Sequence, residues 1–175
     1  MNILTQIAKM AVENYIKEGK IIDVPKNVPE RFKKEKAATF VTIEKKLPNS
    51  KEKELRGCIG TYLPTKENIA KEIISNAISA ATKDFRFEEI KKEELPYLSY
   101  TVYILSKPQK VLSLEELNPK KYGIIVKSGF KTGLLLPDLK GINTKEEQIF
   151  YACQKAGIDP QKEVVEIYKF SAEKY

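Results

Sequence analysis

The chain has 175 residues, 42% of them hydrophobic, and a formal net charge of +7. This length and apolar content suffice for a single folded domain over residues 1–175. The absence of histidine excludes Ser-His-Asp and Cys-His catalysis and histidine-ligated metals. Two widely separated cysteines and no glycine-rich phosphate loop predict neither a metal site nor a cofactor. Because no apolar segment is long enough to span a membrane and Lys9 interrupts the start of the chain, we expect a cytoplasmic protein.

The positive charge is dispersed among acidic residues rather than gathered in one segment. Lysines are interleaved with glutamates over residues 33–36 and 51–54, as on a solvated face. This pattern argues against nucleic acid as a partner. The hypothesis that the protein binds nucleic acid is supported by its net charge alone. Only Arg31, Arg56 and Arg86 are arginines. Since the planar guanidinium makes paired contacts that lysine cannot make, the last two indicate positions of fixed geometry.

The first part of the chain predicts a helix followed by a hairpin. Apolar residues at helical spacing predict a helix over residues 3–16, ended by Gly19. Residues 20–36 contain two prolines and predict an extended segment that covers the core. Residues 38–43 and 55–62 predict two strands of a hairpin, joined by a polar loop over residues 48–53.

A second helix is predicted to begin at Pro64, with Thr65 as its N-cap and an apolar stripe along one face. The stripe comprises Ile69, Ala70, Ile73, Ile74, Ala77, Ile78 and Ala81.

The remainder of the chain is richer in strands. Ser113 and Thr144 each begin a capping-box pattern, and the helix after Thr144 is predicted to end at Gly157. Strands are predicted over residues 97–105, 122–126, 132–136 and 164–170, the middle two forming a second hairpin. Partial alternation of helices and strands, with two hairpins, favours an α+β fold with about three main helices and a mixed or antiparallel sheet.

The sequence LRGCIGT at residues 55–61 places Cys58 between Gly57 and Gly60. These glycines allow a ligand or another backbone segment to approach closely, or serve only a tight bend. In a regular strand Arg56 and Cys58 face one side, so that the guanidinium could stabilise a nucleophilic Cys58 thiolate. In the alternative interpretation, Cys58 is a small core residue.

The sequence DFRF at residues 84–87 follows the second predicted helix. Asp84 and Arg86 either orient a ligand or pair with each other at the exit of the helix. Lys131 lies between two glycines of the second hairpin. It either lines the ligand-binding groove as a second cationic wall or is an exposed lysine of the hairpin. Cys153 lies on the apolar side of its predicted helix and is expected in the core.

Several separate motifs occur in one order along the chain, namely FVTI at 40–43, LRGCIGT at 55–61, DFRF at 84–87, GIIV at 123–126, GFKTGLLLP at 129–137 and KAGI at 155–158. Through them the chain resembles the AMMECR domain family, including the prokaryotic proteins called AmmeMemoRadiSam system protein A. The resemblance implies an α+β domain of two closely packed lobes around a groove, with Memo-like and radical-SAM proteins as partners, but no particular reaction. Phe85 and Lys131 depart from the proline and arginine common in the family.

Our main hypothesis is an accessory module with a ligand-binding groove, which holds an anionic small molecule or the acidic chain end of a partner. One alternative is an enzyme that uses Cys58 as nucleophile or redox centre, with Arg56 lowering its pKa and Asp84 as acid or base. Another is a regulatory module associated with nucleic acid. The candidate ligand-binding residues are Arg56, Gly57, Cys58, Ile59, Gly60, Thr61, Asp84, Arg86, Phe87 and Lys131.

Overall fold

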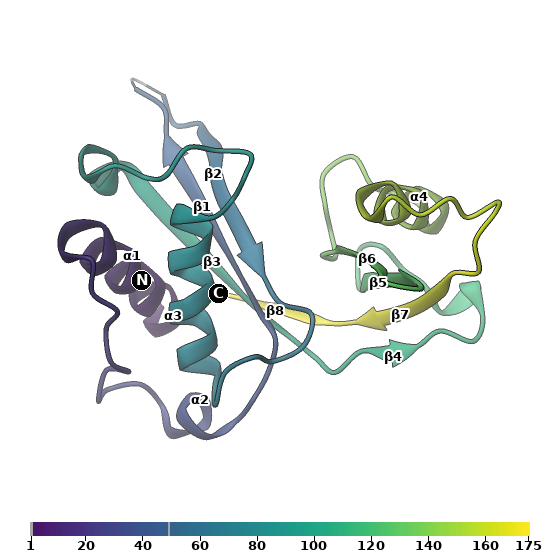
Figure 1. Ribbon diagram of the computed structural model, residues 1–175, viewed down its shortest axis with the longest axis horizontal. Helices are drawn as coiled ribbons and strands as arrows, with labels where there is room; N and C mark the ends of the chain where they lie inside the picture. The colour runs from purple at the N-terminus through teal and green to yellow at the C-terminus, as the bar shows by residue number, and fades with distance from the viewer. Residues whose placement is uncertain (1, 49) are drawn as a thin grey trace. The chain divides into compact units, whose positions relative to one another are not determined.

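The computed structural model describes residues 2–48 and 50–175, which form two compact units (Figure 1). The first unit comprises the chain up to Ile104 together with Glu173–Tyr175, and the second comprises Leu105–Ala172. Each unit contains a four-stranded sheet with antiparallel pairing, and helices pack on both sheets. The α+β prediction is therefore confirmed.

The first unit contains most of the helical residues. Its elements are α1 (Ile3–Glu18), α2 (Glu30–Lys34), β1 (Thr39–Lys46), β2 (Lys53–Gly60), α3 (Ile69–Thr82), the 3-10 helix η1 (Lys92–Tyr97), β3 (Leu98–Leu105) and β8 (Ala172–Lys174). The strand order is β2-β1-β3-β8, so β2 forms an edge of the sheet. Helix α3 packs on β1, β2 and α1 through the predicted apolar stripe, all of which is buried. The stripe therefore joins the helices and the sheet in one core.

The second unit is smaller and has its own core. Its elements are β4 (Gln109–Lys110), the 3-10 helix η2 (Leu114–Glu116), β5 (Gly123–Ser128), β6 (Lys131–Leu135), α4 (Lys145–Ala156) and β7 (Glu166–Phe170). The strand order is β4-β7-β5-β6, and α4 packs on β5 and β6. Cys153 is 1% exposed in this core, as predicted.

The predicted helix ends are largely confirmed, because they depend on local chemistry. Gly19 and Gly157 adopt left-handed conformations with φ of 70° and 65° and end α1 and α4. Ser113 and Thr144 form the predicted capping boxes. None of the helices over the described ranges is long and apolar enough to cross a membrane.

The predicted start of the second helix is wrong. Helix α3 begins at Ile69, and Asn68 caps it by accepting a hydrogen bond from the Lys71 N–H at 2.9 Å. Thr65 instead donates to the carboxylate of Glu72, through its N–H at 2.7 Å and its hydroxyl at 2.9 Å. Glu72 is fully buried, so its carboxylate requires donors that solvent cannot provide.

Two other stretches differ from the predictions or fall partly outside the description. Residues 20–36 are not wholly extended, because α2 forms within them and places Phe32 in the core. The predicted polar loop over 48–53 includes Asn49, which lies outside the described residues, and β2 already begins at Lys53.

Candidate functional site

A β-bulge in strand β2 separates the two residues that the sequence singled out. Ile43 of β1 pairs with Gly57, but the next residue, Glu44, pairs with Leu55. Arg56 is therefore an extra residue with no partner on β1. Because a bulge interrupts the alternation of side chains, Arg56 is free to face the other side of the sheet from the residues beyond it.

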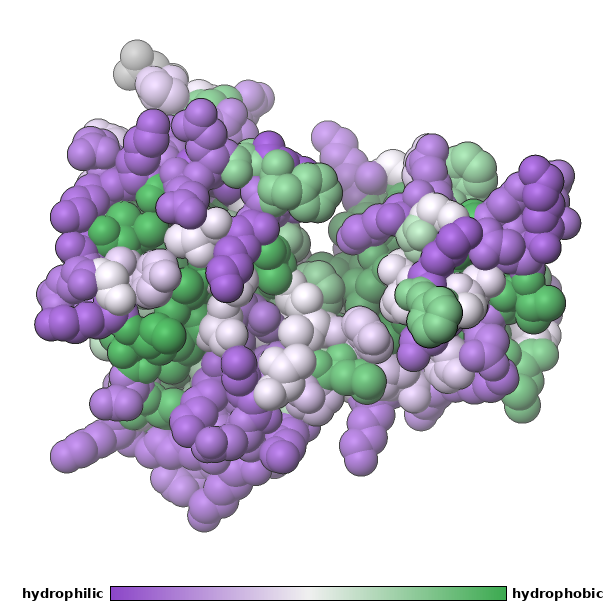
Figure 2. All heavy atoms as spheres, viewed as in Figure 1, coloured by the Kyte–Doolittle hydropathy of each residue, from purple (hydrophilic) through white to green (hydrophobic). Residues whose placement is uncertain are grey.

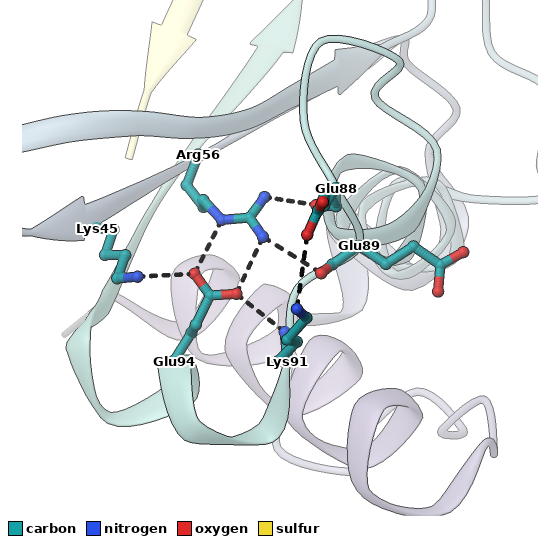
Figure 3. A network of polar contacts seen from close by, with 6 residues as sticks. All are labelled: Lys45, Arg56, Glu88, Glu89, Lys91 and Glu94. Atoms are coloured by element: carbon teal, nitrogen blue, oxygen red, sulfur yellow. Dashed lines mark hydrogen bonds and ion pairs between the residues drawn. The ribbon is translucent and has the colours of Figure 1, made fainter.

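The guanidinium of Arg56 lies in a network of polar contacts with the chain that follows α3 (Figure 3). Its Nε and Nη2 donate to the two carboxylate oxygens of Glu94, each at 2.9 Å. Its Nη1 donates to the Glu88 carbonyl at 2.7 Å, and its Nη2 also donates to the Glu89 carbonyl at 3.3 Å. Lys45 donates to Glu94 as well, at 2.9 Å. The paired contact with Glu94 is the fixed geometry expected of an arginine, but its partner belongs to the same chain.

This network is largely removed from solvent. The side chains of Arg56 and Glu94 are only 13% and 14% exposed. The hydrogen bonds from Arg56, followed by those from the Lys91 N–H and Lys45, lower the pKa of Glu94 to about 2 despite its burial. Arg56 and Glu94 thus connect β2 to η1 and hold the segment between α3 and β3.

The structure corrects the prediction that Arg56 lies beside the thiol of Cys58. Arg56 shares Glu94 with Lys45, whereas the Cys58 Sγ lies 3.2 Å from the hydroxyl of Thr42. Thr42 and Lys45 are three residues apart on β1 and therefore face opposite sides of the sheet. Arg56 is engaged on one side, and Cys58 lies on the other.

Asp84 and Arg86, rather than Arg56, contact Cys58, and they do so at its backbone. The Cys58 N–H donates to Asp84 Oδ2 at 2.8 Å, and Arg86 donates to the two oxygens of Asp84 at 2.9 and 2.6 Å. Arg86 Nη2 also lies 3.5 Å from the Cys58 carbonyl oxygen. The ion pair thus contacts both backbone polar groups of one residue on an edge strand, as a neighbouring strand would. Segments 55–61 and 84–87 therefore come together at one place.

The electrostatics of this pair limit what Asp84 can do chemically. Hydrogen bonds from Arg86 lower the pKa of Asp84 to about 2 and outweigh the opposing effect of burial, with a further lowering by the hydrogen bond from the Cys58 N–H. Asp84 is therefore an anion at neutral pH, and both its oxygens already accept hydrogen bonds. A group of this pKa is poorly matched to general acid or base catalysis near neutral pH.

Arg86 differs from its partner in being accessible. Its side chain is 46% exposed while that of Asp84 is 4% exposed. The hydrogen bond to Asp84 raises the pKa of Arg86, so its guanidinium stays charged. The Nη1 of Arg86 makes no hydrogen bond to any residue that the structure describes. One edge of a fixed guanidinium is thus available to an anion from outside.

Gly57 and Gly60 are explained by packing within the chain. A Cβ on Gly57 would lie 2.1 Å from the Ala80 carbonyl oxygen in α3, and one on Gly60 would lie 2.2 Å from the ring of Phe40. Neither neighbour leaves room for a side chain. The close approach that the glycines allow is therefore that of another backbone segment and a ring, which was one of the sequence alternatives.

Ile59 and Thr61 also have structural roles in the first unit. Ile59 packs against the core, and the Thr61 hydroxyl donates to Glu72 at 2.8 Å. Of the residues predicted between 56 and 61, Cys58 alone remains beside the accessible ion pair.

Lys131 lies in the second unit, on the hairpin of β5 and β6. Its ammonium pairs with Glu163 at 2.7 Å, and the Ser128 hydroxyl donates to the same carboxylate at 3.2 Å. This is the exposed hairpin lysine of the two alternatives, held by an ion pair across the same unit.

The candidate ligand-binding residues predicted from the sequence do not include Phe85, which is 96% exposed between Asp84 and Arg86. Phe87 is half-buried, its N–H donates to the Asp84 carbonyl at 3.0 Å, and its ring lies 5.3 Å from the Arg86 guanidinium. The turn thus buries part of one phenylalanine and presents the other to solvent. The signal that could have found it is an aromatic residue between two charged residues just after a helix.

Comparisons with known proteins agree over nearly the whole chain. The AMMECR1 family model matches residues 5–175. A Thermotoga maritima protein is 49% identical over 164 residues, covering 94% of this chain and 91% of that protein. A Clostridium acetobutylicum protein is 43% identical over 159 residues, covering 90% of this chain but only 32% of that longer protein.

A solved structure agrees with the fold. The crystal structure of a Pyrococcus horikoshii protein superimposes with a TM-score of 0.88 at 34% identity, covering 98% of this chain and 88% of that one. The match extends over both units, as does the family model. On these grounds the chain belongs to the AMMECR1 family.

Proposed function

We propose that this protein is a binding module whose contact surface is the turn of residues 84–87 on the edge of β2. The observation that carries the proposal is the exposure of Phe85 beside Arg86, whose guanidinium is held by Asp84. A fully exposed phenylalanine gains nothing from the fold of its own unit, whereas burial against a partner would stabilise the complex.

The chemistry of the turn suits protein recognition. Aromatic and arginine side chains supply much of the binding energy at protein interfaces. Because Asp84 already fixes Arg86, less conformational entropy is lost when Arg86 binds. Its Nη1, which donates to none of the described residues, suits a carboxylate, such as an acidic side chain or chain end of the partner, or an anionic small molecule.

The partners in this proposal are a Memo-like protein and a radical-SAM protein in a cytoplasmic setting. Support comes from the motifs by which the chain resembles the AmmeMemoRadiSam system proteins. Further support comes from the Clostridium acetobutylicum relative, where the matching segment is part of a chain about three times as long. A domain that is joined to further chain in one relative suits a module that works beside other domains.

The direct test measures binding of the full chain to the Memo-like and radical-SAM proteins of the same organism by calorimetry. We expect Phe85→Ala and Arg86→Ala to weaken binding at least about tenfold, as for interface hot spots. Phe130→Ala is the matched control, because Phe130 is also fully exposed but lies in the second unit. The proposal fails if neither protein binds, or if Phe85→Ala and Phe130→Ala bind equally well.

A second candidate is an enzyme with Cys58 as nucleophile, favoured by the charge of Arg86 near the thiol. Alkylation of Cys58 against pH, read by peptide mass spectrometry, tests it. Cys153 is the internal control, since burial raises the pKa of its thiol. Fast labelling of Cys58 with an apparent pKa well below ~8.5 would support the enzyme. If Cys58 is labelled only when the protein unfolds, and Cys58→Ser binds the partners as the unmodified protein does, the enzyme hypothesis fails and the binding-module proposal stands.

A further inference from the structure

A groove in the first unit lies between α3 and the segment that leaves the end of α1. Its volume is about 490 Å³, within the range of about 300–1,000 Å³ typical of small-molecule sites. Figure 2 shows hydrophobic residues gathered over the α1 and α3 side of this unit and bordered by hydrophilic ones. None of the residues of the 84–87 turn lines the groove. It is therefore distinct from the surface proposed for partner binding.

The floor of the groove is apolar and formed by two segments of the chain. Ile74 and Ile78 of α3 lie one turn apart and are nearly fully buried. Ile22 and Val24 face them from the extended segment after α1, and Tyr15 lines the groove from α1 itself. An aliphatic body of several carbons would bury apolar surface against this floor.

A polar line runs along α3 beside that floor. Lys71, Ser75 and Ser79 follow one another at four-residue spacing, which places them on one side of the helix, and Lys83 lies at its C-terminal end. Ser75 and Ser79 are half-buried, yet their hydroxyls make no hydrogen bond to the described part of the chain. Half-buried hydroxyls of this kind are available to a bound polar group.

The charges at the groove favour an anion. Lys66, Lys71 and Lys83 line it, against a single acid, Asp23. Lys71 pairs with the exposed Glu67, and such surface pairs contribute little. Lys66 and Lys83 form no ion pair with the residues described. The excess of lysine at the rim of an apolar groove makes it complementary to a negatively charged head group.

We propose that this groove binds a small organic anion with an aliphatic body, such as a medium-chain carboxylate. The body would lie on Ile74 and Ile78, and the carboxylate would accept hydrogen bonds from the serine hydroxyls and the rim lysines. The groove is thus a second binding site, independent of the proposed partner surface.

The test is calorimetric titration of the full chain with decanoate, with decylamine as a probe of equal length and opposite charge. We expect decanoate to bind and decylamine not to bind. Lys83→Glu should weaken decanoate binding about tenfold by reversing a rim charge. Lys92→Glu is the matched control, because it makes the same charge change on an exposed lysine outside the groove and should bind as the unmodified protein does.

A second variant tests the apolar part of the site. Ser79→Phe fills the groove and should abolish decanoate binding while leaving the unfolding transition and the partner binding of the 84–87 turn unchanged. Absence of decanoate binding by the unmodified protein overturns the proposal, and so does equal binding of decylamine. Equal weakening by Lys83→Glu and Lys92→Glu would indicate nonspecific attraction and also overturn it.

Discussion

Two arginine–carboxylate pairs near strand β2 show how exposure separates structural from binding roles. Arg56 and Glu94 are both nearly buried, and the guanidinium is further engaged by two backbone carbonyls. Arg86 pairs with a buried Asp84 but is itself nearly half exposed. Both carboxylates have a pKa lowered to about 2. The pairs are alike in charge, yet only the second leaves donors that can reach another molecule.

Removal of the buried guanidinium should have the largest effect on stability. Arg56→Ala leaves the carboxylate of Glu94 without its main partner, and we expect a loss of about 3 kcal/mol in the free energy of unfolding. Urea denaturation measures it. Arg31→Ala is the control, because the Arg31 pair with Glu173 is exposed and should cost at most about 1 kcal/mol. Equal losses for both variants would contradict a structural role specific to Arg56.

The pH dependence of stability should distinguish the two carboxylates. Because the folded-state pKa of Glu94 lies below its ordinary value of 4.5, its contribution is complete above that value and is lost as pH falls towards about 2. Asp84 behaves likewise, from an ordinary value of 3.8. The difference in the free energy of unfolding between Glu94→Gln and the unmodified protein should therefore become smaller below pH 5, as measured by urea denaturation between pH 7 and pH 3. The corresponding difference for Asp84→Asn should become smaller only at lower pH. A Glu94→Gln difference that stays constant over this pH range would contradict the lowered pKa of Glu94.

Substitution of Asp84 should have an intermediate effect on stability. Asp84→Asn keeps the shape but removes the charge that accepts from Arg86 and the Cys58 N–H, and we expect a loss of about 1–2 kcal/mol. Arg86, being accessible, recovers solvation in part. Hydrogen exchange at the Cys58 amide should accelerate in this variant but stay slow in Arg86→Ala. Unchanged exchange in Asp84→Asn would show that the carboxylate does not protect the edge of β2.

Removal of Arg86 itself should have the smallest effect on stability. Arg86→Ala should lower the free energy of unfolding by about 1 kcal/mol, less than Arg56→Ala, because loss of the exposed Arg86 side chain lets water reach the buried Asp84 carboxylate, to which the Cys58 N–H still donates. Partner binding should nevertheless fall, which separates Arg86 from Arg56. Denaturation and calorimetry on the same preparation measure both quantities. If Arg86→Ala destabilised the protein as much as Arg56→Ala does, Arg86 would have a structural role, and the two arginine–carboxylate pairs would no longer differ in function.

Features that depend on neighbouring residues could be predicted from the sequence. The ends of α1 and α4 follow from Gly19, Thr144 and Gly157, because left-handed glycines and capping side chains act within one helical turn. The hairpins follow from alternating strands joined by short polar segments. The buried stripe of α3 follows from helical periodicity, which directly determines the face that meets the sheet.

Features that depend on distant partners required the structure. Thr65 has the chemistry of an N-cap, but a buried carboxylate at Glu72 competes for its donors and α3 begins four residues later. Alternation predicts that Arg56 and Cys58 share a face, but one extra residue in β2 separates them. A bulge leaves no signature in strand alternation itself, since it is a mismatch in length between two paired strands.

The sequence by itself determined the family, the α+β class and the choice of Cys58, Asp84 and Arg86 as candidate site residues, whereas only the structure shows that the 55–61 and 84–87 segments lie together. Only the tertiary structure decided that Arg56 binds Glu94, that Asp84 protects the edge of β2 and that Phe85 faces solvent. The physical reason is that residue type fixes which contacts a side chain is able to make. Which of them it does make depends on the segments that the fold brings to it.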